Sequence, residues 1–222
     1  MTDSAPGALT LALPKGRIMA EFAAFLRRLD IVPEADFFDE KTRKLQFATN
    51  QPGLNLILVR SFDVATFVAF GGAHLGVAGH DVLMETGSND VYAPVDLHIG
   101  KCRLSLAGRA DAGAGQLVSS SHVRVATKYP HTTRAHFAAK GIQAETIKLS
   151  GAMELAPMLG LAPFIVDLVS SGATLKANNL VELEKIADIS SKLIVNRTAY
   201  KTRRAGLHDL VARFEEATDA AA

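Results

Sequence analysis

The chain has 222 residues, of which 48% are hydrophobic and 21% are charged. This composition is ordinary for a soluble globular protein and predicts a sizeable core, in one large domain or two small ones. Lysine and arginine number 24 against 23 for aspartate and glutamate, so net charge gives no general attraction to nucleic acid or acidic membranes. Any anion-binding site is therefore expected to be local.

The chain's beginning and its cysteine content indicate a cytoplasmic protein. The first residues, MTDSAPGA, have neither the basic nor the apolar segment of a secretory signal. No run approaches the roughly 18 apolar residues of a membrane-spanning helix. The single cysteine, Cys102, cannot form an internal disulfide, which fits a reducing compartment. The histidines show no metal-ligand spacing, so no structural zinc site is expected.

The first part of the chain alternates predicted strands and helices. LTLALP (9–14) reads as a buried strand, and the helix after it repeats apolar residues at helical spacing. Further strands are predicted at KLQFATN (44–50), LNLILVR (54–60) and AHLGVAG (73–79), with a short helix at DVATFVAFGG (63–72). This order favours an α/β protein with mainly parallel strands.

The middle of the chain predicts a second α/β unit. Two strands flank a Gly/Ala/Ser-rich segment, residues 110–121, which is expected to be an exposed loop. The predicted elements are strands at 101–109 and 122–129, a helix at 132–141, a strand at 143–151, a helix at 152–162 and a strand at 164–169. An amphipathic helix is predicted at 201–217. We therefore expect two α/β lobes with the second inserted into the first: 1–94 and 178–222 as lobe I, and 95–177 as lobe II.

The segment DLVSSGATLKANNL (167–180) places small hydroxyl and glycine residues directly after a buried strand. A parallel strand, a glycine loop and a helix in succession present backbone N–H groups and the positive end of the helix dipole, which suits an anion. Gly172 would let the backbone approach a phosphate, and Asp167 would bind ribose hydroxyls or a metal ion. The same residues would equally serve to cap a helix and turn the chain.

Cations follow two other predicted strands. Lys15 and Arg17 flank Gly16 after the first strand, and Arg60 ends LNLILVR. Lysine supplies a point charge and arginine a planar fork, and ligands gather at the carboxyl ends of strands in open α/β sheets. Three such cations suit a polyanion such as pyrophosphate. Alternatively, Lys15 and Arg17 are surface charges on a solvated turn.

Two more predicted strands end in glycine. In GVAGHD (76–81), Asp81 is expected to cap the next helix, and His80 is either an acid–base group or a bystander. Gly151 opens another helix, with Ser150 as its expected cap. Glu154 would lie one turn into that helix, where it either faces the helix dipole or contacts a ligand.

Six segments together resemble one enzyme family. In chain order they are LALPKGR, GVAGHD, DLHIGKCRL, VATKYP, IKLSGAMELAPMLGLA and DLVSSGATLKANNL, and the match runs over roughly residues 9–197. They resemble the ATP phosphoribosyltransferases that open histidine biosynthesis. Members transfer the phosphoribosyl group of phosphoribosyl pyrophosphate (PRPP) to N1 of the adenine of ATP and release pyrophosphate, with Mg²⁺. The resemblance implies a two-lobed fold similar to type II periplasmic binding proteins, with the active site in the interdomain cleft.

The resemblance also implies roles for individual residues. Residues 167–174 correspond to the PRPP loop, with Asp167 at the ribose and the others around the 5-phosphate. The PRPP-binding residues would be Asp167, Ser170, Ser171, Gly172, Ala173 and Thr174. The ATP-binding residues would be Leu13, Pro14, Gly79, His80, Asp81, Ser150, Gly151 and Glu154. Arg60, Lys15 and Arg17 are the expected catalytic residues, because they would stabilise the departing pyrophosphate. Mg²⁺ would be held mainly by the substrate phosphates, without dedicated protein ligands.

The length resembles the short form of this family, which lacks a C-terminal regulatory domain. That form works with a regulatory subunit similar to histidyl-tRNA synthetase, and we also expect self-association as a dimer, with neither nucleic acid nor membrane as partner. The sequence departs from the family at three positions. Ala78 and His80 stand where threonine and often arginine are usual, and Ala173 stands where a second threonine is frequent. The backbone of the loop is therefore expected to matter more than any one of its side chains.

A different class of function also fits the composition and the order of elements. A cytoplasmic, non-catalytic module of the periplasmic-binding-protein shape would bind a small anion without changing it. Cations at several strand ends favour a multi-phosphate ligand and hence the enzyme. A DNA-binding regulator is disfavoured by the near-neutral charge and the lack of a basic stripe.

Overall fold

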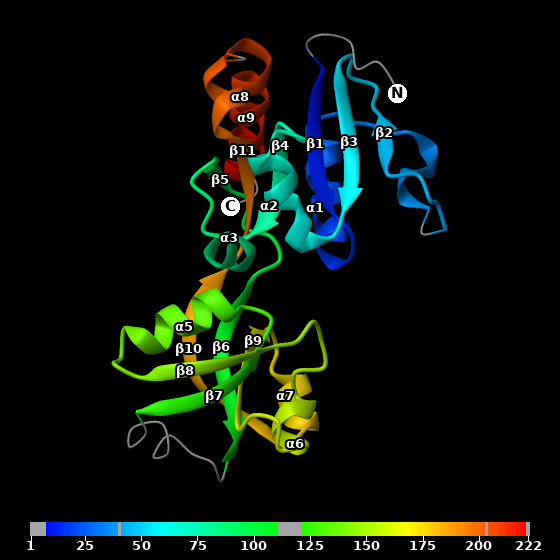
Figure 1. The fold of residues 1–222 in the computed structure, drawn as a ribbon. Helices are drawn as coiled ribbons and strands as arrows, with labels where there is room; N and C mark the ends of the chain where they lie inside the picture. The colour runs from blue at the N-terminus through cyan, green and yellow to red at the C-terminus, as the bar shows by residue number, and fades with distance from the viewer. Residues whose placement is uncertain (1–7, 40, 111–120, 203, 221–222) are drawn as a thin grey trace. The chain divides into compact units, whose positions relative to one another are not determined.

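The computed structural model describes residues 8–39, 41–110, 121–202 and 204–220. It divides into two units: unit 1 comprises Met1–Gly100 and Ser190–Ala222, and unit 2 is Lys101–Ile189 (Figure 1). The expected two-lobed α/β architecture is thus confirmed. Residues 111–120, most of the predicted exposed loop, lie outside the described residues. No helix in the described part of the chain has both the length and the apolar character needed to cross a membrane.

Unit 1 is built on a six-stranded sheet with strand order β2-β3-β1-β4-β11-β5. Its elements are β1 (Leu9–Pro14), α1 (Arg17–Arg28), the 3₁₀ helix η1 (Ala35–Phe38), β2 (Gln46–Ala48), β3 (Leu54–Val59), α2 (Ser61–Ala69), β4 (Leu75–Gly79), α3 (His80–Thr86), β5 (Val91–Asp96), β11 (Ser191–Asn196), α8 (Arg197–Thr202) and α9 (Arg204–Asp219). Strand β1 pairs in parallel with β3 and β4, whereas β11 runs antiparallel to β4 and β5. The three central parallel strands therefore end at one edge of this sheet.

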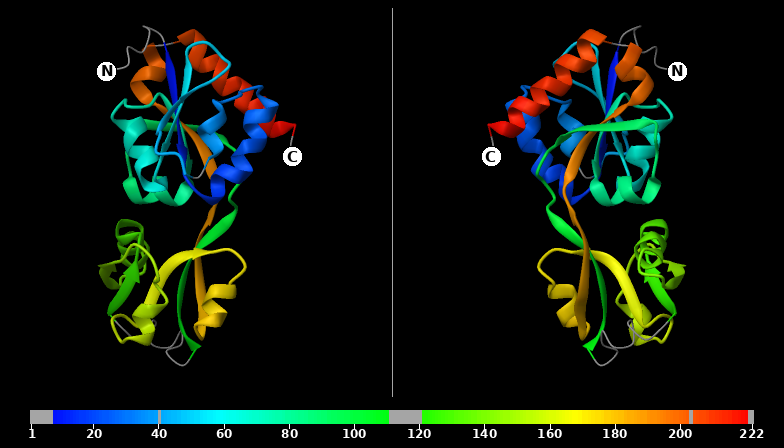
Figure 2. Two further views of the ribbon diagram at one scale, coloured as in Figure 1. Left: turned by 90° about the vertical axis from the view of Figure 1, so that its right-hand side faces the viewer. Right: turned by 90° about the vertical axis from the view of Figure 1, so that its left-hand side faces the viewer.

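The core of unit 1 includes one face of α1 packed against α9. Phe22 and Phe25 of α1 are buried, as the helical spacing predicts, and Phe214 of α9 is fully buried beside them. The rings of Phe22 and Phe214 stack with their centroids 5.9 Å apart. Figure 2 shows the two helices side by side, although they come from opposite ends of the chain. The C-terminal helix therefore completes the core that the N-terminal segment begins.

Unit 2 contains a five-stranded sheet with strand order β10-β6-β9-β7-β8. Its elements are β6 (Cys102–Arg109), β7 (His122–Thr127), α5 (Pro130–Ala138), β8 (Gln143–Lys148), α6 (Leu155–Met158), β9 (Phe164–Val169), α7 (Ala173–Ala177) and β10 (Leu180–Ile189). Strand β7 is parallel to β8 and β9, and β6 is antiparallel to β9 and β10. The carboxyl ends of β7, β8 and β9 therefore share an edge.

The prediction of mainly parallel strands is wrong. Among the described residues, five of the nine strand pairings are antiparallel. Strands β5, β10 and β11 account for most of them, and none of the three was predicted. Strand β10 was placed in lobe I by the expected boundary at 177/178, yet it pairs with β6, so unit 2 extends to Ile189. The boundary expected at 94/95 falls inside β5, which pairs with β11, so unit 1 extends to Gly100.

The packing of α9 against α1 predicts a large effect of Phe214→Ala. Removing a fully buried aromatic ring leaves a cavity, so we expect the free energy of unfolding to fall by about 3–5 kcal/mol. Urea unfolding would measure the change. Phe70→Ala is the matched control, because Phe70 is 88% exposed and its removal should cost no more than about 0.5 kcal/mol. Equal effects of the two substitutions would contradict the assigned core.

Candidate functional site

The three predicted catalytic cations lie at the strand-end edge of unit 1. Pro14 and Val59 are register partners at the ends of β1 and β3, so Lys15 and Arg60 follow directly from neighbouring strands. The backbone N–H of Lys15 donates to the carbonyl of Val59 at 2.9 Å. Arg17 begins α1 after Gly16, whose φ of 103° favours glycine. All three cations are exposed, and within the described residues none of their side chains forms an ion pair or hydrogen bond.

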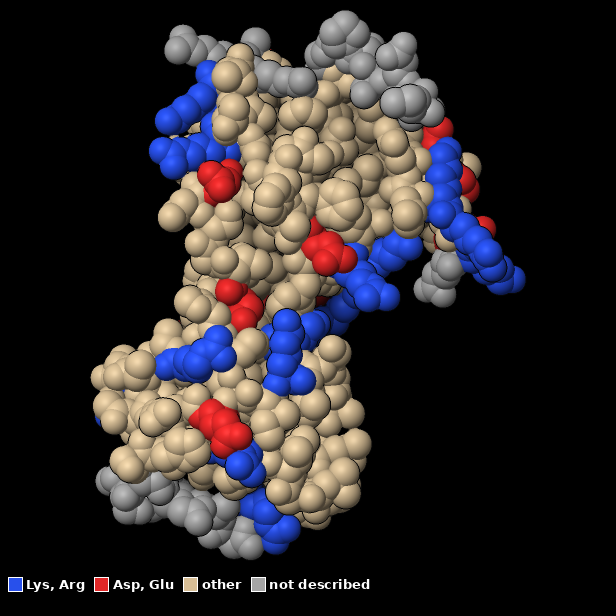
Figure 3. All heavy atoms as spheres, in the orientation of Figure 1, with Lys and Arg blue, Asp and Glu red and all other residues tan. Residues whose placement is uncertain are grey.

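A cavity of about 440 Å³ opens beside Lys15 in unit 1. Its walls come mainly from α1 and from the segment around η1, and apolar side chains such as Met19 and Phe38 form much of them. No sequence feature predicted this cavity. On the face drawn in Figure 3, acidic side chains lie scattered over uncharged surface, and basic side chains form several groups. The exposed cations at the ends of β1 and β3 are thus a local feature, as the near-neutral net charge suggested.

The end of β4 brings Gly79, His80 and Asp81 to the same edge, because β4 is the other parallel neighbour of β1. Asp81 is not the helix cap that the sequence suggested. The cap position is Gly79, and Asp81 sits in the first turn of α3 with 6% exposure. Its carboxylate lies against Gly79 so closely that a Cβ there would be 2.1 Å from Oδ1, which explains the glycine.

The surroundings of His80 favour the neutral form of its side chain. Burial lowers its pKa below the ordinary histidine value, and the nearby charge of Lys192 lowers it further. Its Nδ1 is buried and finds no hydrogen-bond partner among the described residues. The positive charge that an arginine would supply at this position is therefore disfavoured on His80.

Two of the predicted ATP-binding residues lie inside β1. Leu13 and Pro14 are buried, and the side chain of Leu13 belongs to the main hydrophobic core of unit 1. Any contact between Leu13 and a nucleotide would therefore use its backbone. The sequence pattern could place these residues at a strand end but could not separate a backbone role from a side-chain role.

The predicted PRPP loop follows β9 in unit 2. Gly172 has a φ of 78°, in the left-handed region, and the exposed hydroxyl residues Ser170, Ser171 and Thr174 surround it. The helix beyond the loop, α7, has only five residues, so its dipole is far weaker than the sequence suggested. The hydroxyl of Ser171 accepts a hydrogen bond from the N–H of Ala173 at 3.3 Å. Any anion at this loop would thus be bound mainly by hydroxyls and by the remaining backbone N–H groups.

Asp167 lies within β9, three residues before Ser170, where the loop begins. It is half-buried, and its Oδ1 accepts a hydrogen bond from the N–H of Leu168 at 2.8 Å. Its register partner across the sheet is Ser105 of β6. The carboxylate of Asp167 is therefore anchored in the sheet rather than carried by the loop.

The segment after β8 forms a much shorter helix than predicted. Helix α6 covers only Leu155–Met158, its cap position is Glu154, and no side chain caps it. Ser150 is therefore not the helix cap, and Glu154 is not one turn inside the helix. Gly160, with a φ of 72°, closes the segment. Ser150, Gly151 and Glu154 nevertheless share the edge of the sheet on which β9 ends, because β8 and β9 are both parallel to β7.

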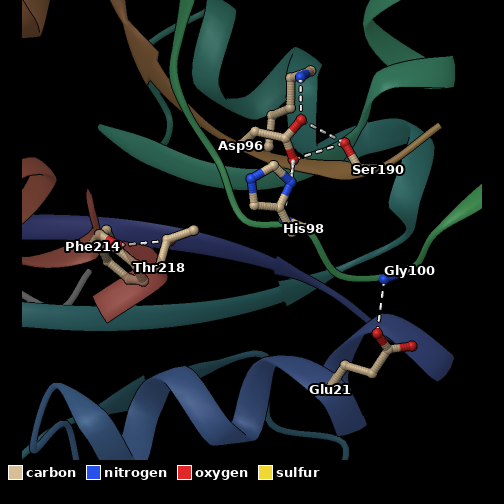
Figure 4. Close-up of polar contacts among 8 residues, drawn as sticks. Glu21, Asp96, His98, Gly100, Ser190, Phe214 and Thr218 are labelled. Carbon is tan, nitrogen blue, oxygen red and sulfur yellow. Dashed lines mark hydrogen bonds and ion pairs between the residues drawn. The ribbon is translucent and has the colours of Figure 1, made fainter. Parts of the chain in front are cut away.

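A polar cluster centred on Asp96 was missed by the sequence analysis (Figure 4). Asp96 accepts hydrogen bonds from Ser190 Oγ at 2.7 and 2.8 Å, from Lys192 Nζ at 2.9 Å and from the N–H of His98 at 3.0 Å. Nearby, the N–H of Gly100 donates to Glu21 Oε2 at 2.8 Å. Burial, the largest effect, raises the pKa of Asp96, but the hydrogen bonds and the charge of Lys192 outweigh it and lower the pKa to about 2.

The fold and these strand ends define a class: a two-lobed α/β protein with anion-suited groups at the carboxyl ends of parallel strands. A family model, HisG: ATP phosphoribosyltransferase, matches residues 60–216. ATP phosphoribosyltransferase of Rhodospirillum rubrum is 56% identical over 99% of this chain and 98% of its own length. That of Paramagnetospirillum magneticum is 58% identical over 94% and 96%.

Solved structures agree with this classification. The ATP phosphoribosyl transferase (HisG:HisZ) complex from Thermotoga maritima matches with a TM-score of 0.81 and 31% identity, covering 96% of this chain and 99% of that one. The periplasmic aliphatic sulphonate binding protein SsuA from Escherichia coli matches with a TM-score of 0.58 at 13% identity, covering 96% of this chain and 73% of that one. The second likeness concerns the fold alone, and it confirms the type II periplasmic-binding-protein architecture.

The chain belongs to the ATP phosphoribosyltransferase family. The predicted reaction is therefore confirmed: transfer of the phosphoribosyl group of PRPP to N1 of the adenine of ATP, with release of pyrophosphate, as the first step of histidine biosynthesis. The alternative of a non-catalytic anion-binding module is not favoured.

The Asp96 cluster predicts a pH-dependent contribution to stability. Because the pKa of Asp96 is lowered on folding, its contribution is fully present above the unfolded pKa near 3.8 and is lost as the pH falls toward 2. Asp96→Asn should lower the free energy of unfolding by about 1 kcal/mol at pH 7, after allowance for solvent screening, and the deficit should shrink below about pH 4. Urea titrations at several pH values would measure it. Asp188→Asn is the control, because the Asp188 side chain is 79% exposed, and a deficit of constant size would contradict the prediction.

Proposed function

We propose that Lys15, Arg17 and Arg60 stabilise the pyrophosphate that leaves PRPP. The observation that carries this proposal is the parallel pairing of β1 with β3, which delivers the three side chains to one sheet edge. Within the described residues, no acidic side chain neutralises them. A lysine point charge and two arginine forks suit a diphosphate, whose charge increases as the bond to the ribose breaks.

The remaining demands of the reaction are modest. Adenine N1 attacks with a lone pair and carries no proton to lose, so the attack needs no strong general base. The barrier lies in breaking the bond between C1 of the ribose and pyrophosphate, with positive charge developing on the sugar and negative charge on the leaving group. The protein's contribution is therefore to position both substrates and to stabilise charge.

For PRPP, we propose binding by Asp167 and by the loop from Ser170 to Thr174. The hydroxyls of the loop would donate to the 5-phosphate, and Gly172 would keep the backbone accessible. Asp167 would accept hydrogen bonds from the ribose hydroxyls. The N–H of Ala173 already donates a hydrogen bond to the hydroxyl of Ser171. Ala173 would therefore contribute to the shape of the loop rather than bind the phosphate through its N–H.

For ATP, we propose a set of binding residues that follow or end strands. The contributing residues would be Leu13, Pro14, Gly79, His80, Asp81, Ser150, Gly151 and Glu154. The buried Leu13 would contribute through its backbone, and the neutral His80 through hydrogen bonding rather than charge.

We propose that Mg²⁺ arrives with the substrates and is bound mainly by their phosphates. Among the described residues, no group of three or more His, Cys, Asp and Glu side chains gathers where it could hold a metal ion. The ion would reduce the negative charge of the diphosphate, alongside the three cations of unit 1.

We also propose a regulatory partner similar to histidyl-tRNA synthetase. The matching structure from Thermotoga maritima is a HisG:HisZ complex, and this chain covers 99% of the matched chain. The chain would work in the cytoplasm as a dimer that associates with this partner. Activity measurements should accordingly be made with the partner present.

Arg60→Ala tests the catalytic proposal. Removing one preorganised cation should lower kcat roughly a hundredfold, while the KM for PRPP changes far less, because the charge on pyrophosphate grows in the transition state. Steady-state kinetics, followed by the absorbance of N1-alkylated adenine, would measure both. Lys201→Ala, which removes an exposed cation from α8, should leave both parameters unchanged. Unchanged turnover in Arg60→Ala would remove Arg60 from the mechanism.

Gly172→Val tests the assignment of the PRPP loop. Valine is strained at a φ of 78°, so the loop should distort even though a Cβ there meets no atom within 4 Å. We expect PRPP affinity, measured by calorimetry, to fall at least about tenfold. Gly141→Val is the matched control, because Gly141 also has a positive φ with open space but follows α5. Wild-type affinity in Gly172→Val would count against the loop.

A further inference from the structure

Arg103 connects two strands of unit 2 with the start of the loop. It lies on β6 opposite Val169, the last residue of β9. Its Nε and Nη2 donate to the two carboxylate oxygens of Glu182 on β10, at 2.6 and 2.5 Å. Its remaining Nη1 donates to the backbone carbonyl of Ser170 at 2.9 Å. A single guanidinium thus joins β6, β10 and the first residue after β9.

Glu182 is itself held in place. The hydroxyl of Ser105, a fully buried residue on β6, donates to Glu182 Oε1 at 2.7 Å. The carboxylate therefore accepts hydrogen bonds from Arg103 and from Ser105, and the paired geometry fixes the plane of the guanidinium. Lysine could not reproduce this arrangement, because an ammonium lacks the planar fork.

The bond to Ser170 determines how the loop begins. The carbonyl of Ser170 and the N–H of Ser171 belong to one planar, trans peptide unit and point in opposite directions. Holding the carbonyl toward Arg103 therefore directs the N–H of Ser171 away from it. No described residue accepts a hydrogen bond from that N–H. It is free to bind an anion at the loop.

We propose that Arg103, held by Glu182 and Ser105, is a positioning residue for PRPP binding: it fixes the peptide between Ser170 and Ser171 so that the N–H of Ser171 faces the 5-phosphate. The inference rests on the proposed PRPP loop. Arg103 acts through the peptide and is not itself a contact to the substrate. Its purpose would be preorganisation, because a loop already in its binding conformation loses less entropy when the ligand arrives.

The alternative is a purely structural ion pair. Partly exposed pairs contribute little to stability, typically less than a few-fold in the folding equilibrium, and they have no selective effect on one substrate. Unit 2 offers a matched pair of that kind, Arg124 on β7 with Glu145 on β8, joined at 2.9 Å. Substituting Arg103 is therefore expected to weaken PRPP binding, whereas substituting Arg124 is not.

The experiment compares Arg103→Lys and Arg103→Gln with Arg124→Gln, in the complex with the regulatory subunit. We expect both Arg103 variants to raise the KM for PRPP and its calorimetric Kd about tenfold, with the KM for ATP within about twofold of wild type. Arg124→Gln should change none of these. Glu182→Gln, which keeps the shape but loses the charge, should give a smaller increase, about threefold. Thermal unfolding would establish that each variant is folded.

The outcomes separate this inference from the proposed loop. If Gly172→Val weakens PRPP binding but a folded Arg103→Lys binds it as wild type does, the loop assignment stands and the positioning role is overturned. If neither substitution weakens PRPP binding, the loop is not the PRPP site. Both the loop assignment and the positioning role of Arg103 are then overturned. A parallel rise in KM for ATP and PRPP, or equal effects of the Arg103 and Arg124 variants, would indicate a structural ion pair and also overturn the role. If Arg103→Gln fails to fold, Arg103→Lys, which keeps the charge and most of the side chain, decides.

Discussion

Parallel pairing of β1 with β3 and β4 is the constraint on which the arrangement of unit 1 depends. It forces three chain segments that are far apart in sequence to turn at one edge of the sheet. The same constraint concentrates positive charge, because Lys15 and Arg60 follow register-paired positions. Like charges at such an edge repel one another unless an anion is present. Such an edge suits a ligand with several negative charges, and the departing diphosphate is the ligand we propose for it.

The PRPP loop proposed for unit 2 would bind its substrate through different interactions. Its loop has no cation of its own between Ser170 and Thr174, and the short α7 contributes little dipole. What remains is hydroxyls and backbone N–H groups, whose value depends on being held in one conformation before the ligand binds. Two residues favour a single loop conformation. Arg103 holds the carbonyl of Ser170 at the start of the loop, and Gly172 adopts the left-handed backbone conformation two residues later. Because binding would depend mainly on the loop backbone, we expect that alanine at position 173, where threonine is frequent in the family, preserves PRPP binding.

The sequence predicted some elements closely and missed others for identifiable reasons. Strands β1 and β9 have the predicted bounds because they are apolar runs, buried over most of their length, that end at a proline or at small polar residues. Strand β10 was not predicted because its middle is charged and only half-buried. The loop after β9 was recognisable from local residues. The contacts of Arg103 with Ser170 and of Asp96 with Ser190 could not be recognised in this way. The partners are 67 and 94 residues apart, and no local pattern encodes such pairings.

The same two chain segments carry both polar clusters. Asp96 and Arg103 lie on the segment that leaves unit 1, and Ser190 and Glu182 lie on the segment that returns to it. Backbone bonds link these segments on each side: Leu97 N–H donates to Ser191, Ser191 N–H donates to Ile99, and Cys102 is in register with Ile189. Gly100 stands between the two clusters with a φ of 63°, and a Cβ there would come within 3.1 Å of Ser191 Oγ. The N–H of Gly100 itself donates to Glu21, so hydrogen bonds hold the backbone of this crossing at Gly100 as well as on either side of it.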